Sequence, residues 1–339
     1  MPAPFFILAV DWSQFATAAW TFLALWTAFW IYVWVRYFPI VYRLIGEAPR
    51  LVAEISEPLS GGEECAFRTG DGLTLRGTYL KTPAERRAGV VLFGHELNGD
   101  RWNATPYVRD LIAAGYDVFT FDFRNHGASD AQPNLTVRPW IATNDVDDVA
   151  AAVDYLASRP DGDPRGLGVL AISRAAGAAI CVAGRDSRIR CLFTDGAYPT
   201  HATHLIYLRR YIDIFIPYPW TFITRRIPDW VYHIFLGAGR RLWGRQNRYR
   251  FVNVEQAARG VRVPVMMVHG GKDRMIPVEA AQALRKCIAG PAKLWVVAEA
   301  KHNGAVFTLP DEYRRRLLRF FAFHLGPRPK RSSKACVAA

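Results

Sequence analysis

The pattern of apolar and polar residues divides the chain into two unlike parts. The stretch Trp12–Val35 holds 24 consecutive residues without a charge, and nine of them are aromatic. After about residue 50, short apolar runs alternate with segments whose apolar residues recur every three or four positions. The first pattern predicts a helix long enough to span a bilayer. The second predicts strands that alternate with amphipathic helices.

The alternating part predicts a layered fold. Its apolar runs, such as Gly89–Phe93, have no polar side, which is typical of strands covered on both faces of a parallel sheet. Together with the intervening helices, they predict the α/β class with a doubly wound, mostly parallel sheet. We expect strands at 51–57, 64–69, 73–80, 89–93, 117–121, 166–172, 189–194, 263–269 and 292–297. We expect helices near 103–114, 144–158, 174–184, 277–288 and 311–324. From about 199 to 258 the chain shows no clear period, and we expect irregular structure there.

The uncharged stretch is best interpreted as a transmembrane helix. A cleaved signal peptide fits poorly, because no Lys or Arg precedes the apolar run and the run is too long. A buried core helix is a third interpretation, although such a helix would have no polar face. Asp11 precedes the span, whereas Arg36, Arg43 and Arg50 follow it. The positive-inside rule therefore places everything after the span in the cytoplasm.

Composition locates a second membrane-related feature. The 339 residues carry a net charge of +13, and 51% of them are hydrophobic, which excludes a disordered chain. The basic excess is local, since residues 201–250 carry +7 and 325–339 carry +4. Nine arginines alternate with eleven aromatic residues in 201–250, a mixture that suits an anionic membrane surface. An ordinary segment with solvated arginines is the alternative. Nucleic acid is disfavoured, because no recognition module is present.

Cysteine and histidine usage predicts neither a disulfide framework nor a metal site. The five cysteines are scattered without a C-x-x-C pair, which fits a reducing compartment. They are Cys65, Cys181, Cys191, Cys287 and Cys336. His201 and His204 are three positions apart but lack supporting Cys or carboxylate ligands. We expect no metal and no cofactor.

Three residues with the side chains needed for acyl transfer follow predicted strands. Ser173 lies in the turn Ala171–Ala175, whose small flanks suit a sharp strand-to-helix turn that exposes a hydroxyl. Asp273 and His302 follow two later strands. Because the carboxyl ends of parallel strands meet at one edge of a sheet, these side chains form a candidate nucleophile, base and orienting acid. Asp195, which also follows a strand, is an alternative acid.

Four motifs in this order resemble the α/β-hydrolase superfamily over about residues 64–325. They are the D-x-R-x-H-G-x-S loop in 121–129, the Ser173 turn, the G-x-x-D-x-x-I-P loop around Asp273, and the terminal His302. The resemblance implies a serine hydrolase. Ser173 would attack an acyl carbonyl, His302 would transfer the proton, and Asp273 would orient the histidine.

The resemblance also implies an oxyanion hole and a cap. The backbone N–H groups of Leu97 and Arg174 would hold the oxyanion, and the insertion at about 199–258 lies where the superfamily has a helical cap. Glu96 takes the place of a usual glycine. Our favoured interpretation pairs Glu96 with Arg174, and the alternative lets Arg174 meet an anionic group on the substrate. Three further histidines are expected to order their loops: His95, His126 and His269.

These inferences define a single-pass membrane protein with a cytoplasmic catalytic domain. We expect an anchor and juxtamembrane segment in 1–50, an α/β-hydrolase domain in 51–325 and a basic tail in 326–339. The expected reaction is cleavage of a carboxylic ester, or a thioester, of a lipophilic acyl substrate through an acyl-enzyme. Its partners would be that substrate and an anionic membrane surface. A peptidase or amidase with the same triad, and a non-catalytic membrane module of the same fold, are the alternatives.

Overall fold

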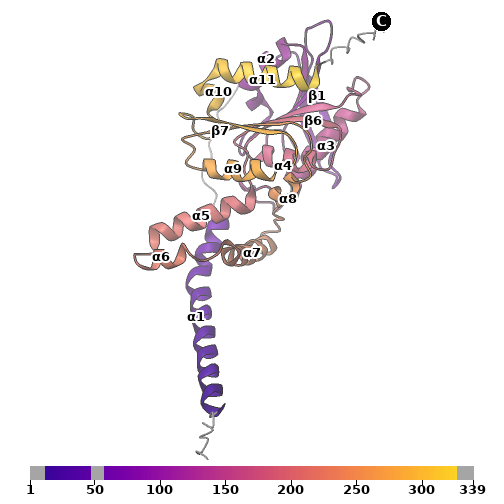
Figure 1. The fold of residues 1–339 in the computed structure, drawn as a ribbon. Coiled ribbons are helices and arrows are strands. Elements are labelled where there is room, and N and C mark those ends of the chain that lie inside the picture. Colours follow the sequence, from indigo (N-terminus) through magenta and orange to yellow (C-terminus); the bar gives the residue numbers. More distant parts are fainter. Residues whose placement is uncertain (1–11, 47–56, 327–339) are drawn as a thin grey trace, which may run out of the picture.

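One eight-stranded sheet lies at the centre of the computed structural model, which describes residues 12–46 and 57–326 (Figure 1). The strand order is β1-β2-β4-β3-β5-β6-β7-β8, with β1 and β2 antiparallel to their neighbours and the other strands parallel. The strands are β1 (Glu63–Arg68), β2 (Thr74–Leu80), β3 (Gly89–Gly94), β4 (Tyr116–Phe121), β5 (Leu167–Ile172), β6 (Ile189–Asp195), β7 (Val265–Gly270) and β8 (Ala292–Val297). The predicted α/β sheet is confirmed, while the strand expected at 51–57 falls almost wholly outside the described residues.

Helices cover both faces of the sheet, with α2, α10 and α11 on one side and α3, α4, α8 and α9 on the other (Figure 1). These helices and the short 3-10 helix η1 have the bounds η1 (Arg101–Ala104), α2 (Thr105–Ala113), α3 (Thr143–Ser158), α4 (Arg174–Ala183), α8 (Val254–Ala258), α9 (Val278–Cys287), α10 (Ala305–Thr308) and α11 (Pro310–Leu325). Successive residues of β3 contribute to opposite cores. Val91 and Phe93 pack beneath α2 and α11, whereas Val90 and Leu92 pack beneath α3 and α4.

The segment between β6 and β7 is helical, as the family resemblance implied, so only the expectation of irregular structure from the residue pattern is wrong. It forms four helices, here called the cap helices: α5 (Thr200–Phe215), α6 (Trp220–Thr224), α7 (Asp229–Gln246) and α8. The buried positions of α7 include Tyr232, Leu236, Gly239 and Trp243, which recur at helical spacing. The helical period of α7 is hard to recognise in the sequence, because glycine lies on its buried face and aromatic residues such as Trp230 lie on its exposed face.

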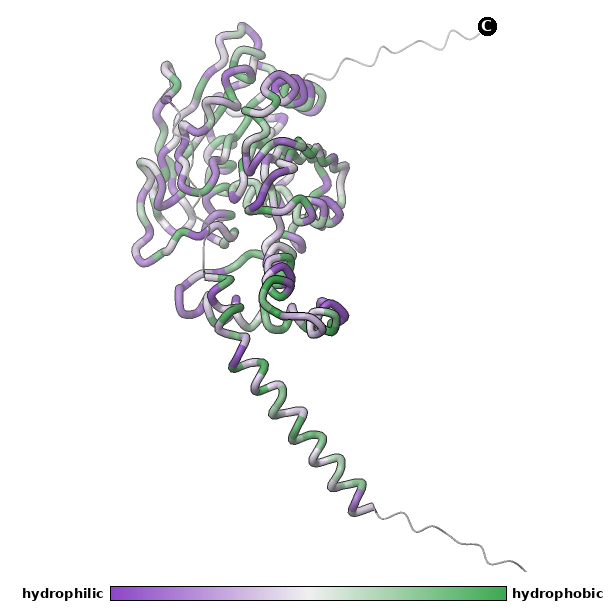
Figure 2. The backbone as a smooth tube through the Cα atoms, turned by 90° about the vertical axis from the view of Figure 1, so that its left-hand side faces the viewer, coloured by the Kyte–Doolittle hydropathy of each residue, from purple (hydrophilic) through white to green (hydrophobic). Residues whose placement is uncertain are grey.

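Helix α1 (Trp12–Gly46) protrudes from the rest of the structure as a largely hydrophobic rod (Figure 2). Its most apolar window of 18 residues contains no buried residue, so the interpretation as a buried core helix is wrong. By length and composition α1 can cross a membrane, and a signal sequence would fit the same description. The helix also continues well past the predicted end at Val35.

The last turns of α1 belong to the core of the domain. Val41 and Ile45 are buried against α7, where a Cβ atom at Gly239 would lie only 2.6 Å from Ile45 Cδ1. The indole N–H of Trp140 donates to the Ile45 carbonyl oxygen at 2.9 Å. Nearer the N-terminus of α1, the ring of Trp34 stacks on Phe235 of α7 at a centroid distance of 4.5 Å. The apolar rod is therefore joined to the cap helices by close packing.

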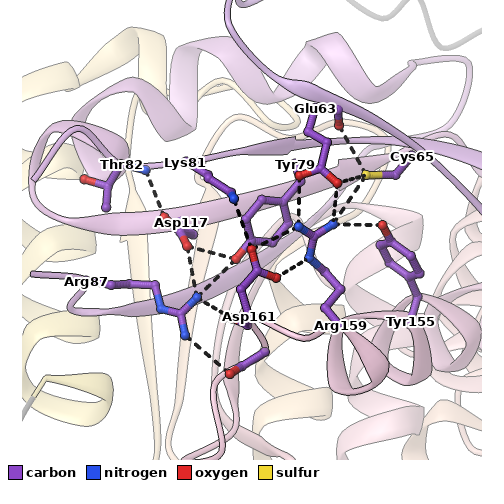
Figure 3. Close-up of polar contacts among 11 residues, drawn as sticks. Glu63, Cys65, Tyr79, Lys81, Thr82, Arg87, Asp117, Tyr155, Arg159 and Asp161 are labelled. Carbon is purple, nitrogen blue, oxygen red and sulfur yellow. Dashed lines mark hydrogen bonds and ion pairs between the residues drawn. The ribbon is translucent and has the colours of Figure 1, made fainter.

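A polar network fixes the antiparallel edge of the sheet, at the end opposite the carboxyl termini of the parallel strands (Figure 3). Arg159 follows α3, and its guanidinium carbon lies 4.0 Å from the ring centroid of Tyr79. The same guanidinium pairs with Glu63 at 3.0 Å and Asp161 at 2.7 Å, and its hydrogen bond lowers the pKa of Asp161 to about 2. Asp117 accepts a 2.9 Å hydrogen bond from the Tyr79 hydroxyl. Strands β1, β2 and β4 are thereby tied to the end of α3.

Candidate active site

Ser173 occupies a strained turn between β5 and α4. Its backbone has φ 53° and ψ −116°, a conformation that side-chain-bearing residues rarely adopt and that lifts the hydroxyl above the sheet. The flanking residues Ala171 and Ala175 carry methyl groups where the superfamily usually has glycine. Gly94 on the neighbouring strand β3 makes room for them, because a Cβ atom there would lie 3.0 Å from the Ala175 Cβ. The sharp turn can therefore carry alanine on both sides of Ser173, because the glycine that gives it room lies on the adjacent strand.

The structure brings together the three side chains that the sequence proposed for acyl transfer. The Ser173 Oγ lies 2.8 Å from His302 Nε2, and His302 Nδ1 lies 2.6 Å from Asp273 Oδ2. These residues come from the ends of β5, β7 and β8, whose carboxyl termini lie at one edge of the sheet. The distances allow the histidine to accept the serine proton while its other nitrogen donates to the carboxylate.

The loop after β7 holds the Asp273 carboxylate in place. Its Oδ1 accepts backbone hydrogen bonds from Met275 at 2.9 Å and Ile276 at 2.8 Å, which leaves Oδ2 for the histidine. His269 donates from Nε2 to the Ile276 carbonyl oxygen at 2.8 Å. The Tyr207 hydroxyl of α5 donates to the Met275 carbonyl oxygen, so a cap helix contacts this loop directly. Sequence reasoning did not identify Tyr207, which carries no motif.

The two residues whose backbone N–H groups are expected to serve as oxyanion donors both follow strands of the parallel sheet. Arg174 begins α4 directly after Ser173, and Leu97 lies in the loop after β3. Neither N–H has a hydrogen-bond partner in the described part of the chain. His95 orders the Leu97 loop, because its Nδ1 donates to the Glu96 carbonyl oxygen at 2.7 Å and its Nε2 accepts from the Phe123 N–H at 3.2 Å. Burial lowers the pKa of His95 to about 3, so this histidine remains neutral.

The expected ion pair between Glu96 and Arg174 is wrong. The Arg174 guanidinium turns towards α3 and pairs with Asp145 at 3.0 Å. Glu96 turns the other way, and its Oε1 accepts a 3.0 Å hydrogen bond from Asn103 Nδ2. Burial raises the pKa of Glu96 to about 7. The alternative interpretation was that Arg174 meets an anionic group on the substrate. The pairing with Asp145 occupies the Arg174 guanidinium and so disfavours this alternative as well.

Asp195, the alternative acid, does not contact the histidine through a hydrogen bond. Its backbone carbonyl accepts from the Ser173 N–H at 2.7 Å, which anchors the turn. Among the described residues, neither carboxylate oxygen has a hydrogen bond of good geometry. Burial raises the pKa of Asp195 to about 7. The geometry therefore favours Asp273 as the acid that orients His302.

The remaining candidate histidines lie apart from this hydrogen-bonded set. His126 donates from Nδ1 to the Arg124 carbonyl oxygen at 2.8 Å. His204 is buried beside Trp140 with a ring-centroid distance of 4.0 Å, and His201 lies at the start of α5. No group of three His, Cys, Asp or Glu side chains is arranged as metal ligands within residues 12–46 and 57–326.

The loop after β4 is fixed by ion pairs of the buried residues Asp122 and Arg124, which the sequence motif does not show. Arg124 pairs with Asp148 of α3 at 2.6 Å and with Asp71 at 2.8 Å. Asp122 pairs with Arg101 at 2.5 Å and accepts the Ala128 N–H at 2.9 Å. These contacts fix the D-x-R-x-H-G-x-S loop as a support for the site.

The strand order, with a serine turn after β5 and loops bearing acid and histidine after β7 and β8, defines the class of protein as an α/β hydrolase. The sequence model of the alpha/beta hydrolase family matches residues 90–316, and the chain belongs to this family. The uncharacterized protein YfhR of Escherichia coli (strain K12) is 22% identical over 271 residues, which cover 78% of this chain and 82% of YfhR.

One further relative and one solved structure are similar to this chain. The thiohydrolase apmlB of Arthrinium phaeospermum is 30% identical over 128 residues, which cover 38% of this chain and 40% of that protein. The solved esterase Pf2001 of Pyrococcus furiosus matches 83% of this chain and 100% of its own, with a TM-score of 0.59 and 19% identity. At this identity the likeness to the esterase concerns the fold. The family and its hydrolase members identify the chain as a hydrolase.

Proposed function

We propose that this chain is a membrane-anchored serine hydrolase that cleaves a carboxylic ester of a lipophilic acyl substrate. The observation that carries the proposal is the continuous hydrogen-bonded path from Ser173 Oγ through His302 to Asp273. A nucleophile, a base and an orienting acid at these distances are the elements of covalent acyl transfer.

In the proposed mechanism, His302 removes the Ser173 proton as the oxygen attacks the acyl carbonyl. The tetrahedral oxyanion accepts hydrogen bonds from the backbone N–H groups of Leu97 and Arg174. His302 then donates its proton to the leaving alcohol, and an acyl-enzyme forms on Ser173. Water enters, His302 removes its proton, and collapse of the second tetrahedral species releases the acid and regenerates the serine.

A thioester is the second candidate substrate, because the thiohydrolase apmlB is similar to part of this chain. The same steps would release a thiol in place of an alcohol. An amide, the substrate of a peptidase or amidase, would need the same residues, but its leaving amine requires protonation before departure.

The surface around α1 supports a lipophilic substrate. The cap helices and the segments that join them carry exposed large apolar side chains: Ile214, Phe215, Tyr218, Trp220, Phe222, Ile223, Trp230 and Ile234. Aromatic residues beside arginines suit the boundary between headgroups and acyl chains. We propose that α1 spans the bilayer, that the cap helices lie at its cytoplasmic surface, and that acyl substrates reach Ser173 from there.

The acyl specificity is tested with p-nitrophenyl esters from acetate to palmitate on the detergent-solubilised full chain. Each buried methylene contributes about 0.8 kcal/mol, so we expect kcat/KM to rise at least about tenfold from acetate to octanoate. The matched octanoyl thioester decides between the two substrate candidates. A maximum at acetate would contradict the lipophilic substrate, and no hydrolysis of any ester or thioester would contradict the proposed reaction.

Two truncations test the anchor. Deleting residues 1–36 removes most of the exposed part of α1 but keeps Val41 and Ile45 in the core, so we expect an active enzyme that remains in the supernatant after ultracentrifugation. Deleting residues 1–46 removes both buried side chains and should lower the free energy of unfolding by about 3–6 kcal/mol. If the variant that lacks residues 1–36 stayed in carbonate-washed membranes, α1 would not be the anchor.

A further inference from the structure

A cationic pocket lies on the cap helices, away from the serine site. Its volume is about 690 Å³, and it opens between the start of α5, the second half of α7 and the segment that follows. Its basic side chains and its one histidine are Arg240, Arg241, Arg245, Arg248, Arg250 and His201. It shares no lining residue with the Ser173, His302 and Asp273 set.

None of the pocket arginines has a counter-ion among the described residues, whereas three of the four other arginines in residues 201–250 have one. Outside the pocket, Arg225 pairs with Asp213 at 3.0 Å. Arg210 of α5 pairs with Glu279 at 3.6 Å, and Arg209 pairs with Asp229. None of the five pocket arginines forms an ion pair with any residue in the described ranges. Five guanidinium groups without ion pairs are therefore concentrated in one cavity.

Arg240 is the pocket arginine whose charged form is most clearly destabilised by its surroundings. Its Nη1 is buried and has no hydrogen-bond partner among the residues that the structure describes. Burial and the neighbouring Arg241 lower the pKa of Arg240 to about 10, although Glu255 acts in the opposite sense. Glu255 itself accepts a 2.7 Å hydrogen bond from the Ala202 N–H. A guanidinium nitrogen held out of water without an acceptor is destabilising unless an anion completes its hydrogen bonds.

We propose that this pocket binds a phosphate group, carried either by a phospholipid headgroup or by a soluble phosphate ester. Guanidinium groups bind phosphate oxygens through paired, charge-assisted hydrogen bonds, and several converge here. Burial lowers the pKa of His201 to about 4, so a neutral imidazole lines the same wall. The cavity is large enough for a phosphate together with the group that it esterifies.

The position of the pocket on α7 suits a lipid source. Trp243 lies beside Gly46, and Phe235 stacks on Trp34, so this stretch of α7 runs alongside the last turns of α1. At a rise of about 1.5 Å per residue, Gly46 lies roughly 16 Å beyond Val35, where the uncharged stretch of α1 ends. If α1 spans a bilayer, the arginines lie near its phosphate layer.

The test compares two double variants of the detergent-solubilised full chain that change the net charge equally. Arg240→Gln with Arg245→Gln alters the pocket. Arg225→Gln with Arg226→Gln alters the same cap surface outside it. The probes, used at 150 mM salt, are glycerol 1-phosphate in solution and phosphatidylcholine nanodiscs with or without phosphatidic acid. Binding is measured by calorimetry for the soluble probe and by interferometry for the nanodiscs.

We expect the pocket variant to weaken binding by about 10- to 100-fold, because each charge-assisted contact contributes about a factor of ten. The control variant should change it by less than about threefold. Binding of glycerol 1-phosphate identifies a soluble ester as the source, and binding only to phosphatidic acid nanodiscs identifies a lipid. Equal weakening by both variants, or no binding of either probe, would overturn the proposal.

Folding of the pocket variant is monitored separately. Removing an unpartnered buried charge should leave the melting temperature without ligand unchanged or higher. The single variant Arg245→Glu is a second test of binding, at an exposed position where the substitution does not disturb the core. It should also abolish most binding. Ester hydrolysis is not needed for any of these readouts, so failure of the proposed reaction would leave the binding result intact.

Discussion

Replacing Ser173 with alanine is expected to lower kcat for ester hydrolysis by on the order of 10³- to 10⁶-fold. The hydroxyl oxygen at 2.8 Å from His302 Nε2 is the atom that would form the acyl-enzyme, and no other group in the hydrogen-bonded set can replace it. The substitution removes one oxygen from a site that packing already fixes, so the melting temperature should change little. Hydrolysis is measured with the preferred p-nitrophenyl ester, and the nucleophile is detected by labelling with a fluorophosphonate.

Ser158 provides the matched control for this experiment. Its hydroxyl donates to the Tyr155 carbonyl oxygen at the end of α3 and takes no part in the hydrogen bonds of the catalytic set. Ser158→Ala should retain both activity and labelling. Labelling of the Ser173→Ala variant at the wild-type rate would place the nucleophile elsewhere, and absence of labelling in the wild type would contradict a serine mechanism.

The second large effect is expected from Asp273→Asn, which should lower kcat by about 10³- to 10⁴-fold. The amide cannot stabilise the imidazolium that forms when His302 takes the serine proton, and it can hold the ring in the wrong tautomer. The Met275 and Ile276 N–H groups can still bond the side-chain oxygen, so the loop should keep its shape. Steady-state kinetics on the preferred ester measure the effect, with circular dichroism as the check on folding.

Asp195→Asn is the informative comparison, because both carboxylates are buried near the same strand ends. Asp195 contributes its backbone carbonyl to the Ser173 turn, and that contact survives the substitution. We expect kcat to change by less than about tenfold. The reverse ranking, with Asp195→Asn the more damaging variant, would show that the orienting acid had been assigned to the wrong residue.

The parts of the fold that the sequence predicted well are those with a single local cause. Gly89–Phe93 is apolar at every position, and only a strand covered on both faces uses such a run in a chain of this type. Ser173, Asp273 and His302 could be located because each lies shortly after the end of a predicted strand. Strand ends in a parallel sheet converge whatever the intervening loops do.

The parts that the sequence did not predict depend on side-chain direction or on distant partners. Glu96 and Arg174 have opposite charges near the same site, but spacing along the chain does not show that Arg174 points to Asp145 on α3. The helical period of α7 was obscured because Gly239 packs on α1, a contact between segments nearly two hundred positions apart. The burial of Ile45 could not be inferred, since nothing local marks the final turns of α1 as core.

If α1 spans a bilayer as proposed, its attachment through Ile45, Trp140 and Phe235 has a geometric consequence. A catalytic domain on a slack tether can swivel and reach neighbouring vesicles or soluble carriers. A domain that packs rigidly on its own transmembrane helix keeps one tilt and one height above the lipid. Its active site would then be reached only by molecules that diffuse laterally within that leaflet. Such an enzyme would act in cis, on the membrane that holds it, and its turnover would follow the surface density of substrate rather than the bulk concentration.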